Sequence, residues 1–145
     1  MSPTVKPGHR NSQRGTTLIE TLVALLVLSI GLLGVAGLQL TSLRNNRSAH
    51  LRSQAQVMAY DITDRMRANR DIAIDGSYNI AIGAVGTAGT LVGDDLVRWK
   101  ETLANSLPGG DGSVQVVNTN VVLITVQWTD QMSATPQQFT TRTRI

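Results

Sequence analysis

The chain has 145 residues, a length that suffices for one small domain and one additional hydrophobic helix. It contains no cysteine, which excludes a disulfide framework and cysteine-based redox or metal chemistry. The formal net charge is +3, but Lys6, Arg10 and Arg14 all precede the hydrophobic stretch, and without them ten basic side chains balance ten acidic ones. Net charge therefore gives no reason to expect DNA as a partner.

Residues 1–15 contain prolines, a glycine and scattered basic side chains, and they show no helical or strand periodicity. Such a composition predicts a segment without regular structure. Its positive charges would favour a cytoplasmic N-terminus, but Arg44, Arg47 and Arg52 follow the hydrophobic stretch in equal number. Counting charges therefore does not decide the orientation of the chain in a membrane.

Residues 16–43 are predicted to form a hydrophobic transmembrane helix. No charged side chain occurs from Thr21 to Leu43, and this run would make a helix of about 34 Å, enough to cross a hydrocarbon core of about 30 Å. Glu20 stands near its start, where a carboxylate in hydrocarbon would cost about 3 kcal/mol and so indicates a function. Three simpler interpretations stay open, namely a secretory signal cleaved near residues 35–37, an uncleaved signal anchor, and a Glu20 that remains in water.

Three glycines, Gly31, Gly34 and Gly37, recur at every third position inside this helix. Each costs about 1 kcal/mol relative to alanine in a helix interior, so a compensating role is expected. Small residues let membrane helices approach closely, and we predict that these glycines serve helix packing. They could equally loosen the helix, or simply reflect how common glycine is in membrane helices.

The residues around the start of the helix, Arg14 to Glu20, read RGTTLIE and resemble the processing site of type IV prepilins. The resemblance implies that residues 1–15 are a leader, which a prepilin peptidase removes by cutting after Gly15. It also implies that Thr16, where the family usually has phenylalanine, becomes the N-methylated new N-terminus. Glu20 would then pair with the N-terminal ammonium group of a neighbouring subunit, and an opposite charge in a low-dielectric bundle is a strong partner.

Residues 44–70 are predicted to continue the helix as an amphipathic segment of a soluble head that spans residues 44–145. One apolar stripe recurs at helical spacing, and its members are Leu51, Ala55, Met58, Ile62 and Met66. Asp61, Asp64 and Arg65 are predicted to form surface ion pairs, not a catalytic pair. Residues 59–70, like residues 99–114 and 126–128, resemble the corresponding segments of PilV-type minor pilins.

Residues 71–93 are predicted to be a glycine-rich loop with one edge strand at residues 78–82, and its glycines lack the context of a phosphate-binding loop. A short helix is predicted at residues 94–107, capped by Asp94 or Asp95 and ended by the Pro-Gly-Gly sequence that follows.

The remaining sequence, residues 113–144, is rich in β-forming residues. Residues 113–117 and 121–128 are predicted to form a hairpin around residues 118–120, and residues 137–144 a third, edge strand. One face of the second strand is apolar and is expected to enter the core; it carries Val122, Ile124, Val126 and Trp128. The predicted fold class is therefore α+β, with a long N-terminal helix packed on a small antiparallel sheet.

No enzyme active site is predicted. His50 is the one histidine outside residues 1–15, so a catalytic triad or a histidine-rich metal site cannot be assembled. Asp111 is assigned to a turn, and the twelve-residue calcium-binding pattern is absent around it. We therefore expect no cofactor, no metal and no small-molecule substrate.

The resemblance implies a structural role, that of a minor type IV pilin that helps to initiate pilus assembly, with consequences for adhesion and twitching motility. Its implied partners are other minor pilins, the major pilin and the prepilin peptidase. The implied location is the inner membrane, crossed once with the head in the periplasm, and afterwards the filament or its tip at the cell surface. Two alternatives stay open: a minor pseudopilin of a type II secretion system, and a simple membrane-anchored domain.

Overall fold

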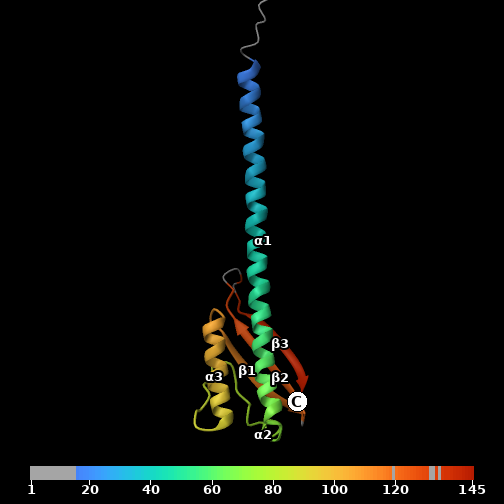
Figure 1. Ribbon diagram of the computed structural model, residues 1–145, viewed down its shortest axis with the longest axis vertical. Helices are drawn as coiled ribbons and strands as arrows, with labels where there is room; N and C mark the ends of the chain where they lie inside the picture. The colour runs from blue at the N-terminus through green and yellow to red at the C-terminus, as the bar shows by residue number, and fades with distance from the viewer. Residues whose placement is uncertain (1–15, 119, 131–132, 134) are drawn as a thin grey trace, which may run out of the picture. The chain divides into compact units, whose positions relative to one another are not determined.

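The computed structural model describes residues 16–118, 120–130, 133 and 135–145. The predicted α+β class is confirmed (Figure 1), and six elements follow one another along the chain: α1 Thr16–Ala68, α2 Arg70–Ile74, α3 Leu91–Ser106, β1 Asp111–Asn118, β2 Val121–Trp128 and β3 Gln137–Arg144. The chain divides into two units, Met1–Arg44 and Asn45–Ile145. We call the second unit the head.

The first part of α1 has no packing partner within the described residues. From residue 17 to residue 43 every side chain is exposed. By length and composition alone, α1 is the one helix in the described part of the chain that could cross a membrane. The candidate span predicted from the charge-free run is thus helical throughout.

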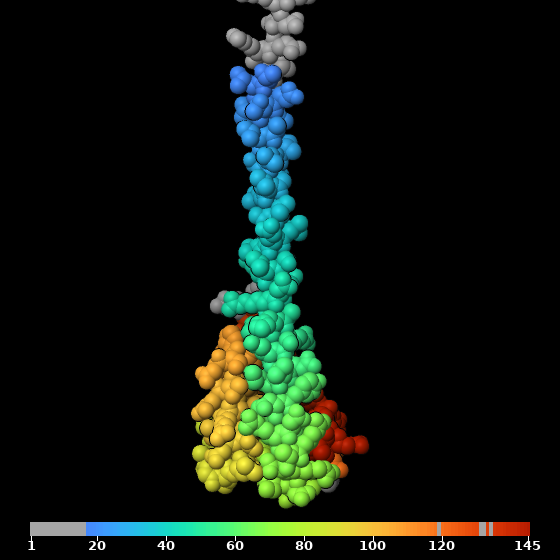
Figure 2. Space-filling view, in the orientation of Figure 1, coloured from blue at the N-terminus to red at the C-terminus, as the bar shows by residue number. Residues whose placement is uncertain are grey.

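In the head, α1 packs one stripe of its surface on the sheet. Leu51, Ala55, Ile62 and Met66 are buried as predicted, whereas Met58 is only partly buried. Two further residues are buried on the same side, Ala59 and Thr63, and the Thr63 hydroxyl donates a hydrogen bond of 2.7 Å to the Ala59 carbonyl. Figure 2 shows this part of α1 on the surface of the head, between α3 and the C-terminal end of the chain.

The sheet has three antiparallel strands in the order β1-β2-β3. Side chains of a strand alternate between its two faces, and the β2 residues that face the helices are all buried, as predicted. These are Val122, Ile124, Val126 and Trp128. The opposite face carries polar cross-strand pairs, including Thr125 with Thr140 and Gln127 with Gln138.

The predicted start and cap of the short helix were wrong. α3 begins at Leu91, and its N-cap is Thr90, whose hydroxyl accepts a hydrogen bond of 3.0 Å from the backbone N–H of Gly93. A threonine in extended conformation serves this role well, and the two aspartates that follow lie inside the helix. Asp94 instead accepts a bond of 3.0 Å from the Gly89 N–H, outside the helix.

The region predicted to be a loop, residues 71–93, also differs from the prediction. It contains most of α2, and α1 itself ends at Ala68 instead of residue 70. No strand forms at residues 78–82; Ile80 makes a single antiparallel bridge to Val114 through two backbone hydrogen bonds of 2.9 Å. β1 begins two residues earlier than predicted, so Asp111 belongs to a strand and not to a turn. Thr119 of the predicted hairpin turn lies outside the described residues.

Candidate functional site

The candidate assembly site predicted from the sequence lies at the start of α1. Thr16 is the first residue of α1, and Glu20 lies one turn further along, with an exposed side chain. Gly15 and the rest of the predicted leader lie outside the described residues. Within the described part of the chain, Glu20 belongs to none of the ion pairs.

The surface that follows Glu20 is apolar on every side of the helix. Thirteen large hydrophobic side chains from Leu22 to Leu43 are each 51–76% exposed. A soluble monomer rarely leaves so large a continuous apolar surface in water. A helix that is hydrophobic all round is normally buried, either in a bilayer or among other helices. Within the described part of the chain, no residue covers this surface.

Three hydroxyl side chains within this apolar part of α1 form hydrogen bonds to the helix backbone. The hydroxyls of Thr21, Ser29 and Thr41 donate hydrogen bonds of 2.7, 2.7 and 3.0 Å to the carbonyl four residues earlier. Such bonds remove the cost of placing a hydroxyl in an apolar environment. Sequence reasoning missed this feature, although the residue types and the helical spacing could have indicated it.

The three glycines of this helix have open space around them. A methyl group added at Gly31, Gly34 or Gly37 would meet no atom within 4 Å. Each of the three positions can therefore accept a close contact from outside the chain. Their role in helix packing stays a prediction.

The head contains a network of polar side chains that joins α1, α3 and the segment between them. Arg65 contacts Asp61 at 3.1 Å, as the sequence predicts, but also Asp95 of α3 at 2.9 Å. The Tyr78 hydroxyl donates a bond of 2.8 Å to the second oxygen of Asp95 and accepts one of 3.2 Å from the Asn69 amide. The predicted surface pair of Asp61 and Arg65 is thus part of a longer, partly buried network. Asp64 and Arg67 form an exposed pair, and Arg67 also donates hydrogen bonds to the Thr143 hydroxyl and the Arg144 carbonyl.

The environment shifts the pKa of two groups in this network. Burial and the hydrogen bond to Asp95 raise the pKa of Tyr78 to about 12. Burial alone would lower the pKa of Arg65, but its hydrogen bonds to Asp95 and Asp61 outweigh burial and raise it. Both groups are held in their ordinary protonation states, and their hydrogen-bonding atoms are engaged within the protein. The network therefore stabilises the head and offers no free acid or base.

Asp111 forms a second polar junction with Lys100. The Lys100 ammonium group forms an ion pair with Asp111 and donates a bond of 3.0 Å to the Ala81 carbonyl. Asp111 also accepts bonds from the backbone N–H groups of Gly83, at 2.6 Å, and Gly112, at 2.7 Å. Burial alone would raise the pKa of Asp111, but the hydrogen bonds from Lys100, Gly83 and Gly112 and the charge of Lys100 together outweigh burial and lower it. The Asp111 carboxylate and Lys100 thus hold the loop around Ala81 and Gly83 next to β1.

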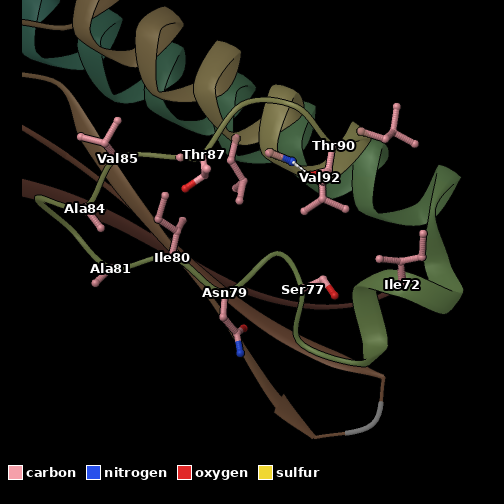
Figure 3. Close-up of a pocket in the computed structure, with 14 residues that line it drawn as sticks. Ile72, Ser77, Asn79, Ile80, Ala81, Ala84, Val85, Thr87, Thr90 and Val92 are labelled. Carbon is pink, nitrogen blue, oxygen red and sulfur yellow. Dashed lines mark hydrogen bonds between the residues drawn. The ribbon is translucent and has the colours of Figure 1, made fainter.

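A pocket of about 620 Å³ lies between the loop that contains residues 77–90 and the first turns of α3 (Figure 3). Its walls are apolar at Ile80, Val92 and Leu96, with the hydroxyls of Thr87 and Thr90 beside them. No lining residue is charged or is a histidine, so the pocket has no acid or base to activate a nucleophile. In the described part of the chain, no group of three or more histidine, aspartate or glutamate residues could hold a metal ion.

Comparison with known proteins identifies one family. Residues 10–36 match the family described as the prokaryotic N-terminal methylation motif. The match covers the predicted cleavage position, Glu20 and the first two of the three glycines. No curated protein and no solved structure matches the chain.

Proposed function

We propose, from the premise that a prepilin-type methylation motif indicates a type IV pilin or pseudopilin, that this protein is a minor type IV pilin. It is a structural subunit that helps to initiate assembly of the pilus, and through the pilus it serves adhesion and twitching motility. The motif implies processing by a prepilin peptidase and assembly with other pilins. The finer assignment, to the PilV type, rests on the resemblance of residues 59–70, 99–114 and 126–128.

The observation that carries the proposal is the uncharged helical surface that begins directly after Glu20. Its thirteen exposed large side chains fit two apolar environments in turn, the lipid of the inner membrane and then the helices of neighbouring pilins. Before assembly the helix crosses the inner membrane once, with the head in the periplasm. During assembly it exchanges lipid for protein, and Gly31, Gly34 and Gly37 allow neighbouring helices to approach closely.

Glu20 sets the register of the subunit in this proposal. Cleavage after Gly15 creates a positive charge at Thr16, and Glu20 accepts the corresponding charge of a neighbouring subunit. Removing one partner of a buried ion pair costs about 3–5 kcal/mol, because the other charge is left without compensation. A subunit without this carboxylate should therefore fail to enter the filament although it is still cleaved.

The first experiment tests the cleavage. Protein isolated from its native cell should begin at Thr16 and carry one added methyl group, as measured by intact mass and N-terminal sequencing. The variant Gly15→Ala should keep residues 1–15, whereas the control Gly8→Ala, a second glycine of the same segment, should be processed normally. A wild-type chain that begins at any residue other than Thr16 would contradict the proposal and favour a simple membrane-anchored domain.

The second experiment tests Glu20 separately. Glu20→Gln should be cleaved like the wild type but should be depleted in sheared pili at least about a hundredfold, as expected when about 3 kcal/mol is lost. The matched control is Asp64→Asn, which removes the same charge from an exposed pair of the head. Equal incorporation of Glu20→Gln and wild type would contradict the assigned role.

A minor pseudopilin of a type II secretion system is the second candidate, because the methylation motif is shared by both kinds of protein. The two differ in their partners. Cross-linking in native cells, followed by identification of the bound subunits, should recover pilus subunits. Recovery of secretion-system subunits alone would favour the pseudopilin.

A further inference from the structure

The charges along α1 are distributed unevenly. Between Glu20 and Asp61 there is no acidic side chain, whereas three arginines occur at positions 44, 47 and 52. The side chains of Arg44, Arg47 and Arg52 are all exposed. We call these three residues the arginine segment.

The arginine segment contributes nothing visible to the fold of the head. Among the described residues, Arg44, Arg47 and Arg52 make no hydrogen bond, and none of the four ion pairs includes them. Later arginines of the same helix behave differently, because Arg65 and Arg67 are both paired with aspartates. Three neighbouring positive charges without a negative partner repel each other, so an external anion would stabilise them.

The position of the arginine segment indicates what that anion is. The charge-free run of α1 ends at Leu43, and a helix rises about 1.5 Å per residue. Arg44 and Arg47 thus follow Leu43 by about 1.5 and 6 Å along the helix, which is within a headgroup layer of roughly 5–8 Å. Arg52 follows by about 14 Å, and its long side chain can still reach a surface potential that extends over a Debye length of about 8 Å.

The arginines also oppose the export of the segment that carries them. Basic residues near a membrane span favour the cytoplasmic side, so three arginines on the exported side work against translocation of the head. A favourable contact on that side would compensate for this disadvantage. Anionic lipids offer such a contact, since they attract basic residues close to a membrane surface.

From these observations we propose that the arginine segment binds the headgroups of anionic phospholipids in the periplasmic leaflet of the inner membrane. The inference rests on the proposed function in one respect, that α1 crosses this membrane with the head in the periplasm. The contact holds the subunit at a defined depth before assembly and must be released when the helix enters a filament. An acidic surface of a neighbouring subunit is the competing partner, and the test below separates it from lipid.

The experiment measures which lipids accompany the full processed chain. Wild-type protein is reconstituted in vesicles of equal parts phosphatidylethanolamine and phosphatidylglycerol, extracted in mild detergent, and its bound lipids are counted by mass spectrometry. We expect phosphatidylglycerol to be enriched about fivefold or more over the vesicle ratio, and high salt to abolish the enrichment.

Three variants make this measurement specific. The triple variant Arg44→Gln, Arg47→Gln, Arg52→Gln should bind both lipids in the vesicle ratio, and the triple replacement of the same residues by lysine should keep the enrichment. The matched control Arg98→Gln, Arg142→Gln, Arg144→Gln removes three exposed charges of the head and should behave like the wild type. The midpoint of thermal unfolding of the head should be the same in the wild type, the triple glutamine variant and the triple lysine variant of the arginine segment.

Two results would overturn the inference. One is equal enrichment of phosphatidylglycerol in the wild type and the glutamine variant of the arginine segment. The other is no enrichment of phosphatidylglycerol in the wild type; cross-links from the segment to an acidic neighbouring subunit that the glutamine variant loses would then assign the segment to a protein contact. The N-terminus of the same samples is sequenced in parallel, so a chain that begins at Thr16 but lacks lipid selectivity contradicts only this inference. A chain that begins elsewhere contradicts the proposed function.

Discussion

The two parts of α1 solve the same problem, the burial of apolar side chains, in opposite ways. In residues 51–66 the apolar side chains form one stripe, and the sheet of the same chain covers it. In residues 17–43 they surround the helix, and all of them are exposed. A single stripe matches one internal surface, whereas an apolar surface on all sides requires an environment that encloses the helix. Among the described residues, the head thus covers its own apolar stripe, whereas the apolar part of α1 stays uncovered.

The glycines of the two regions lead to the same conclusion. Gly34 has no neighbour within 4 Å of an added methyl group, whereas at Gly93 that group would lie 1.8 Å from the Thr87 carbonyl oxygen. At Gly93, two backbone segments of the head are in close contact. At Gly34, the described residues leave open space beside the helix.

The largest expected effect in the head follows from truncating its most buried large residue. Trp99 is fully buried, its indole N–H donates a bond of 2.9 Å to the Met58 carbonyl, and its ring leaves no space for a side chain at Gly112. Trp99→Ala should lower the free energy of unfolding of the head by about 3–5 kcal/mol. Denaturant titration in detergent, followed by Trp128 fluorescence, measures this loss.

The control for Trp99→Ala is Val85→Ala, since the Val85 side chain is 85% exposed, and it should change the stability by less than about 0.5 kcal/mol. Helicity of residues 17–43 should be the same in both variants. A loss of that helicity in Trp99→Ala would mean that the two regions depend on each other, and would break the comparison.

The same glycine-to-alanine substitution should have opposite effects in the two regions. Gly93→Ala should destabilise the head by about 3 kcal/mol, because a backbone overlap with Thr87 must be relieved. Gly34→Ala should stabilise the isolated helix by about 1 kcal/mol, since alanine is the better helix former. Hydrogen exchange of the two helices in detergent measures both changes.

The amount of Gly34→Ala that is incorporated into pili tests whether the open space beside this glycine is used for helix packing. If the three glycines allow neighbouring helices to approach, this variant should enter filaments less well although its helix is more stable. Destabilisation of the isolated helix by Gly34→Ala would show that this part of α1 has an internal contact, contrary to the structure.

The smallest expected effect concerns alkaline pH and is confined to the head. In the unfolded chain Tyr78 should lose its proton near its ordinary pKa of 10.0, whereas in the folded head its pKa is raised to about 12. Between these values the unfolded state binds fewer protons, so the free energy of unfolding of the head falls as the pH rises. The variant Tyr78→Phe has no hydroxyl to deprotonate at this position, so it should not lose stability for this reason.

The stability difference between the wild type and Tyr78→Phe should therefore shrink between about pH 10 and about pH 12. Tyr60→Phe is the control, because Tyr60 is half exposed and bonds only to Gln56 among the described residues. A constant difference over this range would show that Tyr78 is not shielded by Asp95 and its surroundings.

Much of the fold could be predicted because local periodicity reports burial directly. The spacing of Leu51, Ala55, Ile62 and Met66 predicts one buried face of a helix, and alternation along β2 predicts one buried face of a strand; both are confirmed. The start of α1 lies in a short motif with a glycine and an acid at fixed spacing, Gly15 and Glu20. The family match at residues 10–36 supports that motif.

The wrong predictions for the aspartates of the head have a common cause. These side chains bind partners that are far away in the sequence. Asp94 or Asp95 was predicted to cap a helix, but Asp95 binds Arg65, 30 residues earlier. Asp111 was predicted to lie in a turn, but it pairs with Lys100 and the backbone of Gly83. No local pattern distinguishes a carboxylate that caps a helix from one that joins two elements, because both are short acidic side chains in polar surroundings.

The sequence by itself determined the properties that need no knowledge of neighbours: which stretch is free of charge, where its one acid stands, and which faces of the helices and strands are apolar. These follow from residue type and from the fixed geometry of the backbone. Only the tertiary structure decided how the polar residues of the head pair and which residue begins α3. Hydrogen bonds and ion pairs depend on distances of about 3 Å between atoms, and only the folded chain sets such distances between residues that are far apart in sequence.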